Sequence, residues 1–233
     1  RKITFGTISI TRKSKDLIAK ILDSGRVSCG RYVREFEKKF ANLLGTKEAV
    51  AVSSGTDADA LALAVLYDFG AEREDEIIVP ALSFVSTGNA ILQVGFKPPC
   101  VDIDRKTLNI DPIKIERAIT KKTKAIMPVH LMGKPAEMDA VNATARKNKL
   151  FVIEDAAEAY GSIYKGKPTG TLADMGAFSL YVAHMISTAE GGMVVTNKTE
   201  FAEILRSLRS HGRACKCESC VLNISSGYCD KRF

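Results

Sequence analysis

The segment Ser53-Ser54-Gly55-Thr56 places small hydroxyl residues and a glycine where an apolar stretch gives way to a helical pattern. Small residues let a backbone approach a ligand closely, and a helix N-terminus presents free N–H groups and a favourable dipole to phosphate. The same residues are typical of an ordinary helix cap, in which Ser54 or Thr56 satisfies the first N–H groups. Both interpretations stay open for this segment taken alone.

Two further positions could carry acid–base chemistry. Asp155 ends the apolar run that begins at Leu150, and a carboxylate at a strand end can pair with a protonated ring nitrogen, as pyridoxal phosphate requires. His184 follows Ser179 by five residues, and histidine can take and give protons near neutral pH. Each has a structural alternative, because Asp155 can cap a helix or pair with a lysine, and a lone histidine after a strand is usually structural.

Four of the six cysteines crowd near the end of the chain, at Cys215, Cys217, Cys220 and Cys229. No secretory signal precedes them, and such crowding then favours a metal over disulfides. Four thiolates suit either tetrahedral zinc or a [2Fe–2S] cluster. Cys29 and Cys100 stand alone, and we expect both to pack inside the fold.

Short apolar stretches alternate with amphipathic helical patterns along most of the chain. We expect strands at 49–53, 76–80, 97–102, 124–130, 150–155, 176–181 and 193–196, and helices at 31–44, 57–69, 83–94, 113–119, 136–149 and 198–210. This alternation predicts an α/β domain with a mostly parallel sheet. Ligands bind such sheets outside the carboxyl ends of the strands, where the motifs above are expected to lie.

The composition is ordinary for a globular protein, with 45% hydrophobic and 26% charged residues. The longest apolar run, Ala60 to Tyr67, is too short to cross a bilayer, so we expect a cytoplasmic protein without a membrane partner. The net charge is +7, and residues 1–47 alone hold twelve Lys/Arg against four Asp/Glu. Because no nucleic-acid module accompanies these residues, they favour a solvated face or an anionic substrate such as a nucleotide diphosphate over nucleic acid.

Five motifs follow one another along the chain. They are Ser53-Ser54-Gly55-Thr56-Asp57-Ala58, Pro80-Ala81-Leu82-Ser83-Phe84, Pro128-Val129-His130-Leu131, Glu154-Asp155-Ala156-Ala157-Glu158-Ala159-Tyr160-Gly161, and Glu190-Gly191-Gly192 followed by Val194-Val195-Thr196-Asn197. Together they resemble the DegT/StrS family of sugar aminotransferases, which are fold-type-I pyridoxal-phosphate enzymes. The resemblance covers essentially the whole chain and implies a three-layer αβα sandwich, the large domain of such a transferase, over residues 1–212, with an N-terminal arm at 1–30.

The resemblance implies roles around the ring of a pyridoxal-type cofactor. Phe84 would stack on the pyridine ring, and Asp155 would pair with the ring nitrogen. Glu158 stands where relatives place a polar residue against the ring oxygen. Many relatives have glutamine or histidine there, so glutamate is a mild departure.

Further implied roles concern the phosphate and the covalent anchor of the cofactor. Gly55 and Thr56 would hold the phosphate together with the Ser179 hydroxyl. Aminotransferases of the family place a lysine five residues after that serine, and this lysine links to the cofactor and moves the proton. Here the residue is His184, and no lysine lies between Lys167 and Lys198.

This substitution resembles the sugar 3-dehydratase branch of the family. Those enzymes use pyridoxamine phosphate without a covalent link to remove the 3-hydroxyl of a 4-keto-6-deoxy nucleotide sugar. His184 would then take a proton from the carbon that carries the cofactor amine. Two alternatives remain, namely a nucleotide-sugar aminotransferase and a noncatalytic metal- or ligand-binding member of the family.

One group of the 3-dehydratases carries a [2Fe–2S] cluster, which implies a reductase as electron donor. Its Cys-x-Cys pair and its Cys-x-Lys-Arg-Phe ending resemble Cys215-Lys216-Cys217 and Cys229-Asp230-Lys231-Arg232-Phe233. That group draws one ligand from just after the cofactor aspartate, where this chain has Ala157. Cys220 could replace that ligand, zinc could occupy the site, or the site could hold nothing.

The family also implies how the chain is organised. Its active sites lie at a homodimer interface, with residues donated by the partner subunit. The chain begins at Arg1 rather than at a methionine and stops directly after the cysteine-rich loop 213–233. We therefore expect a fragment, with the small C-terminal domain and the donor segments beyond Phe233, from an enzyme of deoxysugar or polysaccharide biosynthesis.

Overall fold

A seven-stranded sheet forms the centre of the computed structural model, which describes residues 6–213. Its strand order is β1-β9-β8-β5-β4-β2-β3. The strands are β1 (Glu48–Val52), β2 (Glu76–Pro80), β3 (Cys100–Val101), β4 (Thr123–Ile126), β5 (Phe151–Asp155), β8 (Met175–Ser179) and β9 (Gly192–Thr196). Every pairing from β8 to β3 is parallel, whereas β9 pairs antiparallel with both β1 and β8. The expected α/β domain with a mostly parallel sheet is confirmed.

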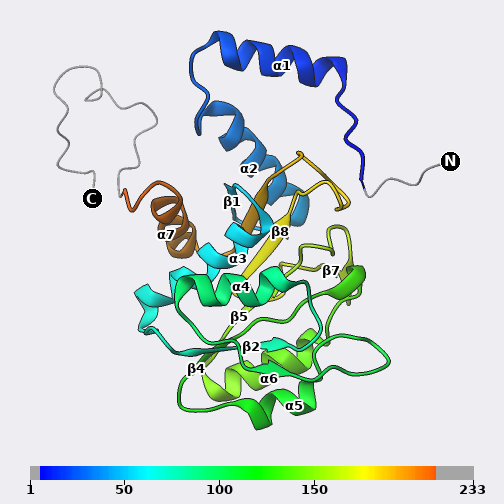
Figure 1. The fold of residues 1–233 in the computed structure, drawn as a ribbon, viewed down its shortest axis with the longest axis vertical. Helices are drawn as coiled ribbons and strands as arrows, with labels where there is room; N and C mark the ends of the chain where they lie inside the picture. Colours follow the sequence, from blue (N-terminus) through cyan, green and yellow to red (C-terminus); the bar gives the residue numbers. More distant parts are fainter. Residues whose placement is uncertain (1–5, 214–233) are drawn as a thin grey trace.

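Helices connect the strands and cover the sheet (Figure 1). The helices of the described residues are α1 (Arg12–Asp23), α2 (Arg31–Leu44), α3 (Gly55–Ala64), η1 (Val65–Phe69), α4 (Val85–Val94), α5 (Pro112–Ala118), η2 (Leu131–Gly133), α6 (Met138–Asn148) and α7 (Thr199–Arg209). Figure 1 shows α4 on one side of β2 and β4, and α5 with α6 on the other side. A separate hairpin consists of β6 (Ile163–Tyr164) and β7 (Lys167–Pro168).

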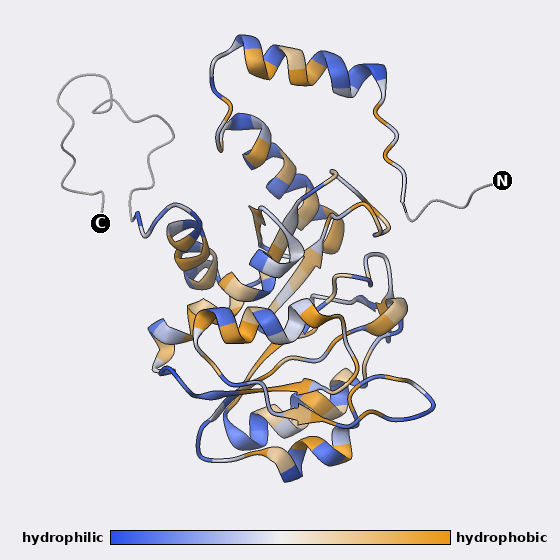
Figure 2. Cartoon of the chain, in the orientation of Figure 1, coloured by the Kyte–Doolittle hydropathy of each residue, from blue (hydrophilic) through white to orange (hydrophobic). Residues whose placement is uncertain are grey.

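The buried side chains of β2 pack against helices on both faces of the sheet. Ile77 and Val79 pack in a cluster with residues of α3, α4 and α7, whereas Ile78 packs with residues of α5 and α6. Successive side chains of a strand point to opposite faces, so a strand covered on both sides is apolar throughout. Figure 2 accordingly shows the strands of the sheet as largely hydrophobic. A third cluster joins α2 to strands β1, β8 and β9 at the other end of the sheet. It includes Phe40 of α2 and Phe178 of β8. The expected three-layer sandwich is therefore confirmed.

One expected helix is divided, and one expected strand is much shorter than its sequence pattern. The helix expected at 57–69 divides into α3 and η1, and it ends at Gly70, whose φ of +83° closes the last turn. Of the strand expected at 97–102, only β3 forms, at the edge of the sheet. Pro98 and Pro99 precede β3, and proline has no N–H to give to a neighbouring strand.

The two isolated cysteines are exposed, so the expectation that they pack inside the fold is wrong. Cys29 lies in the connection between α1 and α2, where no core forms around it. Cys100 belongs to the edge strand β3, in which Val101 is the buried member and Cys100 points outward. Helix α1 itself has no buried residue, and among the described residues no helix is long and apolar enough to span a membrane.

Candidate functional site

The motifs of the sequence meet at one edge of the sheet. Strands β2, β5 and β8 run parallel, and β1 points the same way because β9 is antiparallel to both of its neighbours. The four strands therefore end at a common edge, and the segments after them begin with Ser53, Ala81, Ala156 and Leu180. This is the edge at which open α/β sheets bind ligands.

Helix α3 begins at this edge with a side-chain cap. Ser54 is the N-cap, and its Oγ accepts the N–H of Asp57 at 3.0 Å. The hydroxyls of Ser53 and Ser54 both donate to Asp57 Oδ2. Helix geometry leaves the N–H groups of Gly55 and Thr56 without an acceptor inside α3, so both can serve an anion.

Gly55 lies directly against Ser179. A Cβ placed on Gly55 would stand 2.6 Å from Ser179 Cβ and 2.9 Å from Ser179 Oγ, closer than two side chains can pack. The glycine therefore allows the start of α3 and the end of β8 to touch. This contact brings the Ser179 hydroxyl beside the N–H groups of α3, which is the arrangement expected for a phosphate site.

A second glycine fixes the turn before α3. A Cβ on Gly192, the first residue of β9, would stand 2.0 Å from the carbonyl oxygen of Ser54. No side chain fits there, because the obstacle is backbone. The Glu190-Gly191-Gly192 motif thus has a packing role. Its last glycine lets the start of β9 contact the backbone of Ser54, directly before Gly55.

Asp155 is buried at the end of β5, with 4% of its surface exposed. Thr87 Oγ1 donates to Asp155 Oδ2 at 2.8 Å, and the N–H of Ala157 donates to Asp155 Oδ1 at 3.2 Å. Burial raises the pKa of Asp155, and the hydrogen bond from Thr87 acts against that rise. Each oxygen keeps a further lone pair, so the carboxylate can still accept a proton-bearing nitrogen.

Thr87 is a site residue that the sequence did not single out. It is 1% exposed and lies in α4. Its hydroxyl has one proton, which goes to Asp155, so the 2.7 Å contact between Ser83 Oγ and Thr87 Oγ1 must be a donation by Ser83. A threonine three residues after Phe84 was the available signal, but only the contact across the sheet edge reveals its role.

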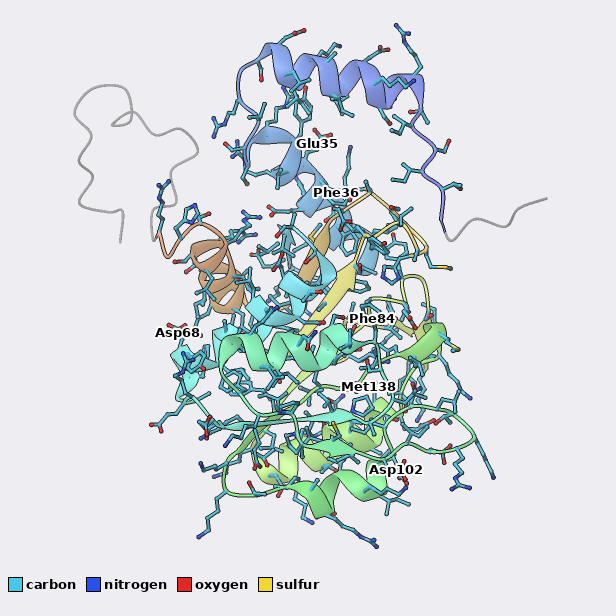
Figure 3. The ribbon with its side chains drawn as sticks, in the orientation of Figure 1. Glu35, Phe36, Asp68, Phe84, Asp102 and Met138 are labelled. Atoms are coloured by element: carbon cyan, nitrogen blue, oxygen red, sulfur yellow. The ribbon has the colours of Figure 1, made fainter. Side chains whose placement is uncertain are left out.

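Phe84 precedes α4 and presents its ring to solvent, with 71% of its surface exposed. Figure 3 shows its label at the end of α4 that faces this edge. Thr87 follows Phe84 by about one helical turn, and so the same short segment orients Asp155 and offers an exposed aromatic face. That pairing is compatible with a flat ring held between Phe84 and the sheet edge.

Glu158 fixes the loop η2 beside the site. Its Oε2 accepts the N–H of Met132 at 2.6 Å, and its charge also raises the pKa of Asp155. Met132 has a φ of +53°, which is unusual for a residue with a side chain, and 81% of its surface is exposed. Asn109 Oδ1 accepts the N–H of Leu131 at 3.2 Å, so two side chains hold this strained loop in place.

His184 lies in the loop 180–191 that connects β8 to β9. The loop is closed by hydrogen bonds from Leu180 N–H to Gly191 O at 2.9 Å and from Thr188 N–H to Leu180 O at 3.0 Å. The half-buried His184 ring meets Tyr181 edge to face, with 6.3 Å between the ring centroids. Its link to the rest of the site is Ser179, at the base of the loop; no contact of His184 with Asp155 or Gly55 is seen in the described part of the chain.

A buried histidine–glutamate pair supports this edge from within. His130 Nδ1 accepts the N–H of Ala136 at 3.0 Å, so the ring proton must be on Nε2, which donates to Glu154 Oε2 at 2.9 Å. Glu154 also accepts the N–H groups of Gly170 at 2.8 Å and Leu172 at 2.6 Å. Both side chains are fully buried. Both residues belong to motifs of the sequence, but the sequence alone does not predict this bond.

The predicted metal site lies outside the described residues. Cys215, Cys217, Cys220 and Cys229 all follow Arg213, where the description of the chain ends. Within residues 6–213, no group of three or more His, Cys, Asp or Glu side chains is arranged to hold a metal ion.

The described edge thus offers two complementary charges. The start of α3, beside Ser179, suits an anionic group, and the Asp155 carboxylate suits a cationic one. Asp155 pairs with Ala177 on β8, two residues before Ser179, which corresponds to about 7 Å along the strand. A flat cofactor that carries a phosphate and a protonated ring nitrogen fits this pattern.

Comparison with known proteins places the chain among enzymes of this kind. It is 42% identical over 215 residues to the GDP-4-keto-6-deoxy-D-mannose 3-dehydratase of Yersinia pseudotuberculosis, covering 90% of this chain and 55% of the relative. It is 41% identical over 212 residues to the GDP-perosamine synthase of Caulobacter vibrioides, covering 91% and 56%. The structure of the E. coli GDP-4-keto-6-deoxy-D-mannose-3-dehydratase with bound hydrated PLP superposes with a TM-score of 0.82 at 37% identity, covering 90% and 55%.

The chain spans about half the length of the curated relatives that it matches. Residues 9–228, nearly all of it, match the model of the DegT/DnrJ/EryC1/StrS aminotransferase family. Its relatives in that family include both sugar 3-dehydratases and amino-sugar synthases. The chain therefore belongs to the DegT/DnrJ/EryC1/StrS aminotransferase family, whose members modify sugars with a pyridoxal-type cofactor.

Proposed function

We propose that the protein containing this chain is a pyridoxamine-phosphate-dependent dehydratase that removes the 3-hydroxyl of a 4-keto-6-deoxy nucleotide sugar. The observation that carries the proposal is His184, which stands five residues after Ser179, where aminotransferases of the family have lysine. A 3-dehydratase is among the relatives, with 42% identity. The step would belong to deoxysugar or polysaccharide biosynthesis.

The proposed cofactor site uses the two charges of the sheet edge. Gly55 and Thr56 would bind the phosphate through their N–H groups, and the Ser179 hydroxyl beside Gly55 would complete that contact. Asp155 would hold a protonated ring nitrogen, oriented by Thr87. When bound, pyridoxamine phosphate supplies an amino group for the keto carbon of the sugar and a ring that accepts electrons.

Two further residues would set the position of the ring. Phe84 has an exposed face for stacking, and aromatic pairs of this kind add about 0.5–1.5 kcal/mol beyond the area that they bury. Glu158 uses Oε2 for the N–H of Met132, so Oε1 is the oxygen that would meet the ring oxygen. Because Glu158 is bonded to the loop η2, it would also fix that loop against the ring.

His184 would take the proton from the carbon that carries the cofactor amine. Imidazole accepts and returns protons near neutral pH, and unlike lysine it forms no stable covalent link to the cofactor. No lysine lies between Lys167 and Lys198, so no residue of this segment could replace the missing anchor. In the proposed site, His184 would carry the proton, and no covalent bond would link the cofactor to this residue.

The test is the product formed by the full-length protein with pyridoxamine phosphate and a 4-keto-6-deoxy nucleotide sugar, identified by mass spectrometry. We expect loss of the 3-hydroxyl, and we expect His184→Asn to abolish it, by 100-fold or more as is typical of a lost general base (~10²–10⁴-fold). His211→Asn is the matched control, because His211 is exposed near the end of α7 and its φ of +64° is tolerated by asparagine. Unchanged turnover in His184→Asn would refute the proposal.

The second candidate is a nucleotide-sugar aminotransferase, which is favoured by the 41% identity to GDP-perosamine synthase. With glutamate as amino donor, it would give an amino sugar with the 3-hydroxyl intact. A noncatalytic ligand-binding protein would give neither product. The same mass spectrum therefore separates all three candidates.

The remaining parts of the proposal concern partners and metal. We propose a homodimer, with a reductase as electron donor if Cys215, Cys217, Cys220 and Cys229 hold a [2Fe–2S] cluster. Light scattering checks the dimer, and iron and sulfide analysis against zinc checks the cluster. Absence of iron and sulfide in protein purified without oxygen would remove the cluster and its reductase from the proposal.

A further inference from the structure

Asp59 is a buried carboxyl group that the proposed chemistry does not use. It lies in α3, which packs against α4, β5, β8 and β9, and 3% of its surface is exposed. The other buried residues of α3, which are Ala58, Ala62 and Leu63, are apolar. Within the described residues, Asp59 Oδ1 is buried and has no hydrogen-bond partner.

The charge that acts on Asp59 is that of another carboxylate, Asp155. Burial raises the pKa of Asp59 well above its ordinary value, and the negative charge of Asp155 adds to that rise. Asp155 has the hydrogen bonds from Thr87 and Ala157 to favour its ionised form. Two carboxylates that share a buried place do not both ionise readily, so the group without donors keeps the proton.

The elements around Asp59 offer no compensating cation. Helix α4 and strands β8 and β9 contain no ionisable side chain. On α7, Arg206 bonds to Glu48 and Arg209 to Glu37, and both carboxylates balance those charges. On α3 itself, Asp57 bonds to Ser53 and Ser54. Glu154, next to Asp155 on β5, is already bonded to His130.

We propose that Asp59 is a positioning residue that stays protonated at neutral pH, which leaves Asp155 as the one negative charge available to a cofactor ring nitrogen. The inference rests on the proposed cofactor site. Its physical content is a division of roles between two buried acids: Asp155 is the ion, and Asp59 is the neutral acid behind it. A second charge would repel the first and would also disfavour an incoming phosphate.

The position of Asp59 along α3 makes this effect strong. Asp59 follows Gly55 by four residues, which is about 6 Å along the helix axis. An ionised Asp59 would thus lie close to the N–H groups proposed for the phosphate, in surroundings that screen charge poorly. Cofactor affinity should therefore fall when Asp59 loses its proton, even though Asp59 touches neither the phosphate nor the ring.

The first test needs no cofactor. Infrared spectra of the cofactor-free, full-length protein at pH 7 report protonated carboxyl groups by their carbonyl stretch. We expect the band to lose intensity in Asp59→Asn and to be unchanged in Asp68→Asn. Asp68 is the control because it is exposed and lies in η1, which follows α3 (Figure 3). An unchanged band in Asp59→Asn would mean that Asp59 is ionised and would overturn the proposal, whatever the enzyme's reaction.

The second test separates positioning from a purely structural role. We would titrate pyridoxal phosphate into wild type and Asp59→Asn between pH 6 and pH 9, with about pH 7 as the physiological reference. Above the titration point of Asp59, the wild-type affinity should fall by up to about tenfold per pH unit relative to the variant, whose amide cannot ionise. Identical pH profiles would overturn the positioning role.

A third measurement covers the case in which Asp59→Asn does not fold. Asp59→Ser removes the same charge with a smaller side chain and is compared in the same way. In addition, folded wild type keeps on Asp59 a proton that the unfolded state releases, so the contribution of Asp59 to the free energy of unfolding is largest below the unfolded pKa of aspartate and is lost as pH rises through the raised pKa. A wild-type stability that is flat over that range would contradict the proposal.

Discussion

The contact between Gly55 and Ser179 gives the most direct test of the phosphate site. In Gly55→Ala, the new Cβ would stand 2.6 Å from Ser179 Cβ, whereas ordinary contact begins at 3.4 Å. The start of α3 and the end of β8 must then separate by about 0.8 Å. Because Ser179 Cβ is fixed to the strand backbone, no flexible side chain can absorb this shift.

The expected cost follows from that displacement. Overpacking a tight contact costs about 1–3 kcal/mol of folding stability. A misplacement of about 1 Å can lower activity ~100-fold, because the donors no longer converge on one group. We therefore expect Gly55→Ala in the full-length protein to unfold at lower urea concentration and to bind pyridoxal phosphate at least about tenfold more weakly, which corresponds to ~1.4 kcal/mol.

Gly88→Ala is the matched control for this change. Gly88 is inside α4, and a Cβ there meets no atom within 4 Å. Alanine in a helix is favoured over glycine by about 0.5–1 kcal/mol, so the control should be as stable as wild type or more stable. If Gly55→Ala matches Gly88→Ala in both unfolding and spectroscopic titration, then α3 and β8 do not meet as described, and the argument for a shared phosphate site fails.

Two further changes test the support of the site. Thr87→Val removes the donor to Asp155 Oδ2, so it should raise the pKa of Asp155 further. We expect it to cost about 1.5–3 kcal/mol of stability and cofactor affinity together. An unchanged titration with pyridoxal phosphate would contradict this expectation. Glu154→Leu leaves the buried donors of His130, Gly170 and Leu172 without an acceptor. We expect it to lower the free energy of unfolding, measured in urea, by about 3–5 kcal/mol. The control is Glu35→Gln, which breaks an exposed pair with Lys39 and should change the free energy of unfolding little.

The fold could be predicted from the sequence because its signal is local. The helix expected at 31–44 and the strand expected at 76–80 have the bounds of α2 and β2. The expectations failed where a neighbour decides the outcome. The apolar stretch 97–102 forms only the edge strand β3, and Cys100 is exposed although cysteine is commonly buried.

Of the candidate site, the sequence indicated the residues at strand ends but not their contacts. Asp155 could be named because a carboxylate after an apolar run is unusual, and it does lie buried at the sheet edge. Its partner Thr87 is 68 residues away in sequence and has no distinguishing pattern. The same holds for Asp59, which stands in an apolar helix without a visible partner; only the packing of α3 on β5 reveals which charge it faces.

The site therefore separates binding from reaction. Gly55, Ser179 and Asp155 would serve an aminotransferase and a dehydratase equally, because both must hold a phosphate and a ring nitrogen. The loop that carries His184 joins this platform through Ser179 and through the buried Leu180, whose N–H donates to Gly191 O, and His184 itself is not one of these joining residues. A lysine at position 184 could both anchor the cofactor and carry the proton, whereas a histidine retains only the second capacity. Of the two reactions, the proposed dehydration is the one that needs a proton carrier without a covalent anchor, and this is why His184 carries the proposal.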